Sequence, residues 1–332
     1  MKRINKTQVV LFALGILLFV YSIYVLGGAS VELFRANFNA KYMWLYVVFT
    51  TLAIFPLVWR WQAILKGYGK SIGFFKLLRM QLAGYAVSFV TPSSRIGGEP
   101  LRIYMLKKEC NVDYKTGTAS IILDKYMEYL GSLTFGFIGV ALLIFVPNMP
   151  ELIRLILFGA IIFSMLVLTY VYYRLSREKG LFHNLFSIFL SKKRLGKMSK
   201  SLKDIDSRLS YFMIHQKRAF FASYFFYIVS AVVVILEFKF LLLSFGVSTS
   251  LLELILVVMI VGITTLIPLP MALGSMEFGQ SGLFALLKNQ GGVGLLFSLI
   301  YRIRGLVFSA IGFCLLIIFS GKDILRKSKR GV

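Results

Sequence analysis

Residues 88–107, SFVTPSSRIGGEPLRIYMLK, interrupt an apolar stretch of the chain with two prolines, a Gly-Gly pair, one glutamate and two arginines. Residues 267–279, IPLPMALGSMEFG, interrupt a second apolar stretch in a similar way. In each, a glutamate stands seven residues after a proline, as Glu99 follows Pro92 and Glu277 follows Pro270. Because the chain holds only seven prolines and fourteen acidic residues, the shared spacing suggests two related breaks, with chance as the alternative.

The composition around the two breaks is that of a membrane protein. The 332 residues are 58% hydrophobic and their mean hydropathy is +0.78, which is more apolar surface than a soluble domain of this size can bury. Repeated apolar runs of about 20 residues match the thickness of a bilayer. The runs are continuous rather than alternating, which favours helices over a β-barrel. We therefore predict an all-α, polytopic protein of the cell membrane.

Six apolar runs are predicted to span the bilayer. The N-terminal run is long for a signal peptide and lacks a clear cleavage site, so it is interpreted as the first transmembrane helix. The basic residues, which give a net charge of +24, fall in short tracts between the runs, and this pattern places both termini in the cytoplasm. The predicted spans are residues 9–26, 42–61, 118–145, 152–173, 220–245 and 293–319.

Two broken apolar segments, residues 74–107 and 251–288, remain between these spans. The basic tracts put both ends of the first segment inside, and the order of the neighbouring spans puts both ends of the second outside. We therefore expect two re-entrant helical hairpins that point toward each other from opposite sides. Residues 42–145 and 219–319 then form an inverted repeat within a single membrane domain, residues 1–332. Paired breaks of this kind indicate the substrate site of a transporter.

The residue types of the first break suit a polar site at membrane depth. A broken helix leaves backbone N–H and C=O groups unpaired, so the break must be buried in protein or line a wet cavity. Gly97 and Gly98 allow a tight backbone path, and helix N-termini at a break attract anions. Arg95 and Arg102 add positive charge that can form forked hydrogen bonds with a phosphate. Glu99 is expected to pair with an arginine, or to take a substrate amine or a proton.

Other charged residues lie within or near the predicted spans. Asp124 and Glu128 lie one turn apart on one helical face, with Lys125 beside them. A charge near the bilayer centre costs about 3 kcal/mol on insertion scales, so such groups face the bundle and pair with each other. They either form a path for a lipid headgroup or serve as structural pairs and snorkelling side chains. The remaining charged residues of this kind are Glu277 with Arg302, which would form such a structural pair, and Glu237, Lys239 and Arg304.

The most basic region, residues 174–218, contains an amphipathic helical pattern. Its apolar residues recur every three or four positions, opposite Lys200, Lys203 and Arg208. This helix either lies on the inner membrane surface, attracted by anionic lipid, or packs on the membrane domain as an ordinary loop helix. The apolar positions are Met198, Leu202, Ile205, Leu209 and Phe212.

Several function classes lack support in the sequence. No nucleic-acid-binding fold is visible, so the positive charge does not indicate a nucleic-acid partner. Cys110, Cys314, His183 and His215 are isolated, so we expect no metal site and no disulfide framework. No P-loop and no catalytic constellation are present, and no cofactor is expected.

The two breaks, with ASIILDKYMEYL at 119–130 and LIYRIRGLVFSAIGF at 299–313, resemble the lysylphosphatidylglycerol synthase transmembrane-region family, also described as flippase-like. The resemblance covers nearly the whole chain and implies lipid translocation. Two departures are present. Met271 and Ala272 stand where the family commonly has glycines, and we expect no soluble aminoacyl-transfer domain like that of the full synthases, so lysyl transfer is not expected. The matching positions are Pro92, Gly98, Glu99, Arg102, Asp124, Lys125, Pro268, Pro270, Gly274, Glu277 and Arg302.

Three functions are compatible with the sequence. The first is a lipid translocase, flippase or scramblase, that moves a phospholipid or lipid-linked headgroup between the facing hairpins. The second is a membrane enzyme of lipid-linked sugar or aminoacyl-lipid metabolism, which the lack of a metal cluster disfavours. The third is a non-transporting partner of a lipid synthase. The chain could also assemble with copies of itself. The predicted translocation residues are Arg95, Gly97, Gly98, Glu99, Arg102, Asp124, Lys125, Glu128, Pro270, Gly274, Glu277 and Arg302.

Overall fold

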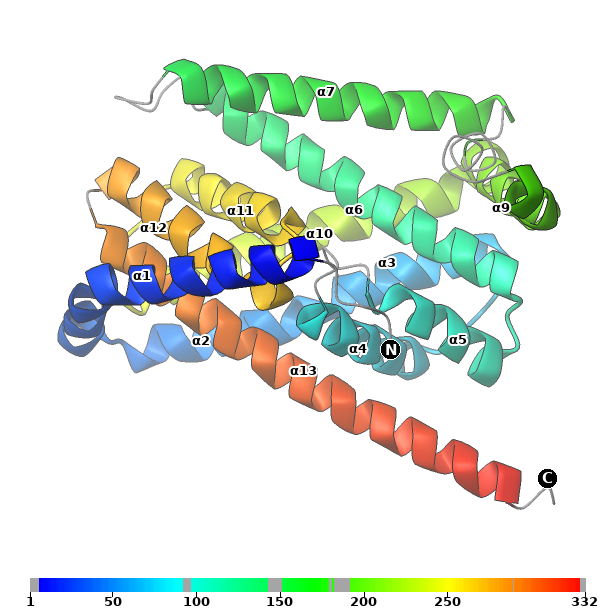
Figure 1. The fold of residues 1–332 in the computed structure, drawn as a ribbon, viewed down its shortest axis with the longest axis horizontal. Coiled ribbons are helices and arrows are strands. Elements are labelled where there is room, and N and C mark those ends of the chain that lie inside the picture. The colour runs from blue at the N-terminus through cyan, green and yellow to red at the C-terminus, as the bar shows by residue number, and fades with distance from the viewer. Residues whose placement is uncertain are drawn as a thin grey trace. The chain divides into compact units, whose positions relative to one another are not determined.

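A computed structural model describes residues 6–91, 97–142, 151–178, 181, 192–288 and 290–328, and these residues form helices and no strand (Figure 1). The chain divides into two compact units. Unit 1 comprises Met1–Thr50, Leu78–Arg102 and Val234–Val332, and unit 2 comprises Thr51–Leu77 and Ile103–Val233. The all-α prediction is therefore confirmed for the described residues.

The helices are distributed over the two units as follows. Unit 1 holds α1 (Lys6–Asn37), α11 (Leu251–Leu266), the short 3₁₀ turn η2 (Pro270–Ala272), α12 (Ser275–Lys288) and α13 (Gly291–Ser328). Unit 2 holds α3 (Ile54–Gly67), α6 (Tyr114–Leu142), α7 (Glu151–Ser176) and α9 (Lys192–His215). Four helices have residues in both units, namely α2 (Ala40–Leu52), α4 (Phe74–Val90), α5 (Glu99–Cys110) and α10 (Lys217–Leu243).

Five helical stretches of the described chain are long and apolar enough to cross a membrane. The remaining predicted span, residues 118–145, corresponds to α6, which is not among the five. Three charged residues, Asp124, Lys125 and Glu128, lower its hydropathy, and residues 143–145 lie outside the described residues. Five of the six predicted spans are therefore found within the described residues, as Gly15–Asn37, Ala40–Gly67, Arg154–Ser176, Lys217–Leu243 and Gly291–Phe319, and the span 118–145 stays a prediction.

The second of these spans is two helices rather than one. A turn at Ala53 separates α2 from α3, three residues before Pro56. Proline has no N–H to donate to the carbonyl four residues earlier, here that of Leu52, and its ring crowds that carbonyl. Pro56 therefore explains why α2 ends at Leu52.

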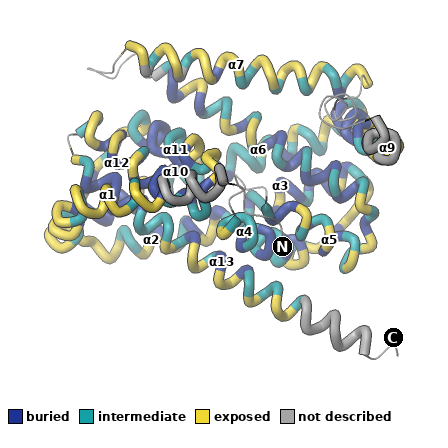
Figure 2. The backbone as a smooth tube through the Cα atoms, in the orientation of Figure 1, coloured by how far each residue is buried: buried dark blue, intermediate teal, exposed yellow. Residues whose placement is uncertain are grey.

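Most of α7 is exposed, as Figure 2 shows, and its exposed large side chains include many apolar ones. Leu155 and Phe163 expose 71% and 68% of their surface, and buried residues are few among the described side chains of α7. A soluble protein rarely leaves such a continuous apolar surface in water. This surface is therefore suited to lipid, as expected for a membrane span.

Each unit has its own packed core. In unit 1, α12 packs against α11, α13 and α1, and Phe284 and Phe297 are fully buried. In unit 2, α6 packs against α3, α7 and α9 around a cluster that includes Leu123 and Met127. These cores position the polar groups described below.

The amphipathic pattern of the basic region forms α9, and its apolar face is used inside the protein. Leu209 and Phe212 belong to the buried core of unit 2, and Leu202 is buried as well. Lys200 and Lys203 remain exposed. Of the two alternatives for this helix, the structure agrees with a loop helix packed on the membrane domain, because its apolar face is not available to a membrane surface.

Candidate functional site

Both predicted broken segments consist of a helix, an interruption and a second helix. The first contains α4 and α5, and the second contains α11, η2 and α12. Their bounds, 74–110 and 251–288, agree with the expected segments 74–107 and 251–288. The re-entrant course, the inverted repeat and the cytoplasmic termini stay predictions. Arg95, a predicted site residue, lies outside the described residues.

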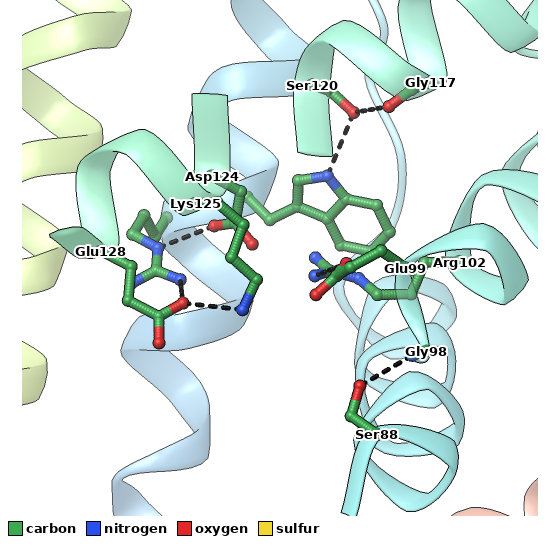
Figure 3. Close-up of polar contacts among 11 residues, drawn as sticks. Ser88, Gly98, Glu99, Arg102, Gly117, Ser120, Asp124, Lys125 and Glu128 are labelled. Carbon is green, nitrogen blue, oxygen red and sulfur yellow. Dashed lines mark hydrogen bonds and ion pairs between the residues drawn. The ribbon is translucent and has the colours of Figure 1, made fainter. Parts of the chain in front are cut away.

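Close backbone contact holds the first break against α4. A Cβ atom added to Gly98 would lie 1.8 Å from the carbonyl oxygen of Gly84, so both glycines are needed for the approach. The backbone N–H of Gly98 donates to the hydroxyl of Ser88 at 2.8 Å, as Figure 3 shows. Gly97 lies in the same turn. The predicted tight backbone path is therefore present at Gly98.

An ion pair follows this turn in the first helical residues of α5. Arg102 Nη1 donates to Glu99 Oε2 at 2.9 Å, and both side chains are buried (Figure 3). The side chain of Arg102 also lies over Gly84, where a Cβ atom would come within 2.7 Å of Arg102 Cγ. A side chain at position 84 would therefore displace the arginine as well as the backbone.

The second break has an unusual backbone. Met271, Ala272 and Gly274 have positive φ angles of 56°, 50° and 79°. Residues other than glycine rarely adopt this left-handed conformation, because the Cβ atom crowds the following carbonyl. Pro270 begins the short 3₁₀ turn in which this happens. Met271 and Ala272 thus adopt the conformation that glycine would favour.

A buried carboxylate and an arginine hold this break together. Glu277 is fully buried in the first turn of α12, and its Oε1 accepts hydrogen bonds from Nε and Nη2 of Arg302 on α13. Its Oε2 accepts from the N–H of Gly274 at 2.8 Å. Arg302 Nη1 donates to the carbonyl oxygen of Met271 at 3.2 Å. One ion pair therefore joins two helices and caps the strained backbone between them.

Helix α1 packs directly on the second break, which the sequence analysis did not anticipate. A Cβ atom on Gly274 would lie 2.2 Å from the carbonyl oxygen of Gly15, and one on Gly15 would lie 2.8 Å from that of Leu273. The guanidinium carbon of Arg302 lies 5.3 Å from the centre of the Phe19 ring, also on α1. The lone Gly15 within an apolar run was the signal for this contact in the sequence.

Within unit 1, α4 runs along α13 toward the turn that carries Arg302. Gly312 lies against Leu82, Phe308 against Tyr85, and Gly305 against Phe89. The contacts nearer the C-terminal end of α4, where the first break begins, are also the ones nearer to Arg302 on α13. The end of α4 that leads into the first break therefore lies against the part of α13 near Arg302, which sequence spacing alone did not reveal.

A third buried pair in unit 1 involves residues whose role the sequence left open. Arg304 Nη1 lies 3.1 Å from Glu237 Oε1, which also accepts from the Thr50 hydroxyl at 2.8 Å. The ring of Tyr301 lies 5.2 Å from the Arg304 guanidinium carbon. Lys239 is exposed. The contacts of Glu237 and Arg304 agree with the structural-pair alternative.

The charged residues of α6 form a separate cluster in unit 2 (Figure 3). Asp124 Oδ1 accepts from Arg60 Nε on α3 at 2.7 Å, and these two side chains expose 1% and 2% of their surface. Glu128 Oε2 accepts from Lys125 Nζ at 3.0 Å and lies 3.7 Å from Arg60 Nη2. Beside them, Trp61 Nε1 donates to the Ser120 hydroxyl at 3.3 Å.

Arg60 is the residue of this cluster that the sequence analysis missed. It was counted as part of the span 42–61 and not as a partner for Asp124. An arginine within an apolar span is rare and usually paired inside the bundle, which is the signal that was available. The described residues of the chain hold no group of three or more histidine, cysteine, aspartate or glutamate side chains that could bind a metal ion.

Comparison with known proteins connects this arrangement to a family. A family model described as "Lysylphosphatidylglycerol synthase TM region" matches residues 8–312. A UPF0104 membrane protein from Methanothermobacter thermautotrophicus is 32% identical over 136 residues, which are 40% of this chain and 38% of that protein. No solved structure matches the chain significantly.

More distant relatives agree with this assignment. A UPF0104 membrane protein from Pyrococcus horikoshii is 29% identical over 82 residues, which are 24% of each chain. Another, from Methanocaldococcus jannaschii, is 28% identical over 92 residues, which are 28% of this chain and 27% of that protein. The matches thus span well under half the length of these curated relatives.

Proposed function

Because the chain belongs to the lysylphosphatidylglycerol synthase TM region family and is an integral, multi-pass membrane protein, we propose that it moves a lipid headgroup across the cell membrane. The observation that carries this proposal is the pair of helix breaks, both of which fall in unit 1. Each break is followed by a buried glutamate bound to an arginine, and α13 contacts both α4, which leads into the first break, and Glu277 of the second. Fixed charges at helix breaks inside a membrane protein are typical of substrate sites.

The arginines are the groups that would bind the headgroup. Arg102 and Arg302 are already held by Glu99 and Glu277, so their charge is compensated while no substrate is present. A phosphate can replace a carboxylate as the partner of a guanidinium because both accept the same forked hydrogen bonds. The arginines would exchange one anion for another, which avoids the large cost of leaving a buried charge unpaired.

The glutamates would then act as gates. A glutamate displaced from its arginine must take a proton, bind a headgroup amine or move toward water, since an unpaired carboxylate is unstable in an apolar interior. Glu277 has a further task, because its Oε2 also holds the Gly274 amide. Displacing Glu277 would therefore loosen the second break, whereas the Gly98 amide of the first break is held by Ser88.

The experiment is a headgroup-accessibility assay on fluorescent phospholipids in liposomes that contain the purified protein. Arg302→Lys keeps the charge but loses the fork, and Arg302→Met loses both. Lys288→Gln is the matched control. Lys288 lies at the C-terminal end of α12, whereas Glu277 lies at its N-terminal end, and Lys288 forms an ion pair with Glu253 of α11. We expect Arg302→Lys to slow lipid movement about 10-fold and Arg302→Met to abolish it, while Lys288→Gln moves lipid at the wild-type rate.

Two outcomes would contradict the proposal. In the first, the wild-type protein moves none of a broad lipid panel, with or without a pH gradient or membrane potential. In the second, folded Arg302→Met moves lipid as fast as the wild type. The first outcome would favour an enzyme or a non-transporting partner of a lipid synthase instead.

A further inference from the structure

None of the charged pairs described above contributes a residue to the lining of a hollow in unit 2. It has a volume of about 590 Å³ and lies between the C-terminal end of α3, the second half of α9 and the junction of α9 with α10. This size is within the range of roughly 300–1,000 Å³ that is usual for small-molecule pockets. The polar residues that line it are Lys66, Tyr68, Ser207, Arg208, Tyr211 and Gln216.

The hollow is built by specific contacts between α3 and α9. The Tyr68 hydroxyl donates to the carbonyl oxygen of Arg208 at 3.0 Å, and the Tyr68 ring lies 5.6 Å from that of Phe212. A Cβ atom on Gly67 would come within 2.7 Å of the Phe212 ring, so α3 approaches α9 closely just before the chain turns away at Gly69, whose φ is 68°. The shape of the hollow is therefore fixed by packed groups.

The charge of the hollow is positive. Lys66 and Arg208 line it together with hydroxyl and amide groups, and no carboxylate is among the lining residues. Asp113 lies outside the lining and approaches Arg208 Nη2 at 3.4 Å, so it offsets part of that charge. Three further basic residues adjoin the lining in sequence and are exposed, namely Lys70, Lys217 and Arg218. The hollow thus suits an anion that accepts several hydrogen bonds.

The hollow also has a defined level relative to the membrane spans. The span Ala40–Gly67 ends at a lining residue, and the span Lys217–Leu243 begins directly after another, Gln216. Ends of spans lie where the hydrocarbon meets the polar headgroups. We propose that this hollow binds the phosphate headgroup of an anionic phospholipid at the membrane surface, as a site separate from the helix breaks.

The test measures bound lipid and needs no transport activity. The full chain is reconstituted into bilayer discs of phosphatidylcholine with increasing phosphatidylglycerol, and the phosphatidylglycerol retained on the protein is counted by native mass spectrometry. Lys66→Gln removes a charge, and Ser207→Glu adds an opposing one at an exposed position of α9. Ser201→Glu is the matched control, because Ser201 is an exposed serine on the same helix outside the hollow.

We expect Lys66→Gln and Ser207→Glu each to weaken phosphatidylglycerol retention about fivefold, as one charge near an anionic surface implies, and Ser201→Glu to leave it unchanged. An equal loss in Ser201→Glu and Ser207→Glu would overturn the proposal in favour of diffuse charge attraction. Unchanged retention in folded Lys66→Gln and Ser207→Glu would also overturn it. If inorganic phosphate displaces the lipid at equal concentration, the hollow is a site for free phosphate, and the lipid assignment fails.

Discussion

The two helix breaks of unit 1 share their sequence punctuation but differ in how they are held. Each has a glycine in contact with the backbone of a second helix, Gly98 with Gly84 and Gly274 with Gly15. Each then has a buried glutamate in the first turn of the following helix. In the first break the glutamate bonds to Arg102 of the same helix, and in the second to Arg302 of another helix.

This difference assigns different tasks to the two breaks. The Glu99–Arg102 pair spans three residues of α5 and leaves the break amide to Ser88. The Glu277–Arg302 pair joins α12 to α13 and also binds the amide of Gly274 and the carbonyl of Met271. The first break is therefore closed mainly by backbone contact, whereas the second depends on one buried ion pair. A similar local sequence thus leads to different energetics when the partner is distant in the chain.

The largest effect that we expect distinguishes the two arginines. Arg302→Met leaves Glu277 fully buried without its charged partner and frees the Met271 carbonyl, so it should lower the free energy of unfolding by about 3–5 kcal/mol. Arg102→Met should cost less, because the Glu99–Arg102 pair lies within one turn of α5, whereas the Glu277–Arg302 pair joins two helices. Chemical unfolding in detergent micelles measures both. Equal losses for the two variants would remove the distinction between the breaks.

The second-largest effects on the free energy of unfolding are expected from glycine-to-alanine substitutions at the breaks. Gly274→Ala places a Cβ atom 2.2 Å from the Gly15 carbonyl at a φ of 79°, and should cost at least about 2 kcal/mol of unfolding free energy. Gly98→Ala, which clashes with Gly84, should cost a similar amount. Gly262→Ala is the control, because nothing lies within 4 Å of its Cβ position on α11. We expect Gly262→Ala to raise the free energy of unfolding by up to about 1 kcal/mol. If Gly262→Ala instead lowers it as much as Gly274→Ala does, the close-contact argument is contradicted.

A stabilising substitution tests the strained backbone of the second break. Ala272 has a φ of 50°, a conformation that costs an alanine about 1–2 kcal/mol. Glycine would relieve this strain, but it loses more conformational entropy on folding, which offsets part of the relief. Ala272→Gly should therefore raise the free energy of unfolding by about 0.5–1 kcal/mol. A shift of the thermal midpoint in detergent shows the sign, and a downward shift would mean that the backbone is not strained there.

The smallest effect concerns an exposed ion pair that contrasts with both buried ones. Burial acts to raise the pKa of Asp113, but hydrogen bonds from the Thr116 hydroxyl and amide and the charge of Arg208 outweigh it and hold the pKa below its ordinary value. A carboxylate with a lowered folded-state pKa stabilises the fold above its unfolded pKa, and this stability is lost as pH falls through the folded pKa, below about 4.

Asp113→Asn should remove this acid-dependent part, which is under about 1 kcal/mol because the pair is largely in water. Unfolding at pH 7 and pH 3 compares the variant with the wild type. If the variant loses as much stability as the wild type between these two pH values, Asp113 does not contribute to the acid sensitivity.

Much of this arrangement could be predicted from the sequence, because proline, glycine and charge act locally. The bounds of the second broken segment, and the presence of Glu277 and Arg302 in it or near it, follow from such local signals. The Glu277–Arg302 pair was also considered from sequence, since buried charges need partners. The apolar periodicity of α9 predicted a helix with one apolar face.

What could not be predicted depends on contacts between segments distant in the chain. Gly15 contacts the second break more than 250 residues away, and nothing in its own neighbourhood specifies that partner. Arg60 of α3 pairs with Asp124 of α6 for the same reason. The apolar face of α9 fits a membrane surface and a protein core equally well, and only the packing against α6 and α7 decides between them.

The most direct test of the central claim is whether the two breaks act on one headgroup. Lipid movement is measured in proteoliposomes for Glu99→Gln, for Glu277→Gln and for the double variant, with folding checked for each. If both glutamates act on the same headgroup, each single variant should move lipid at least about 10-fold more slowly than the wild type. The double variant should then be no slower than the slower single variant, because the effects of mutations within one site are not additive. Two single losses that multiply in the double variant, or single variants as fast as the wild type, would contradict the account.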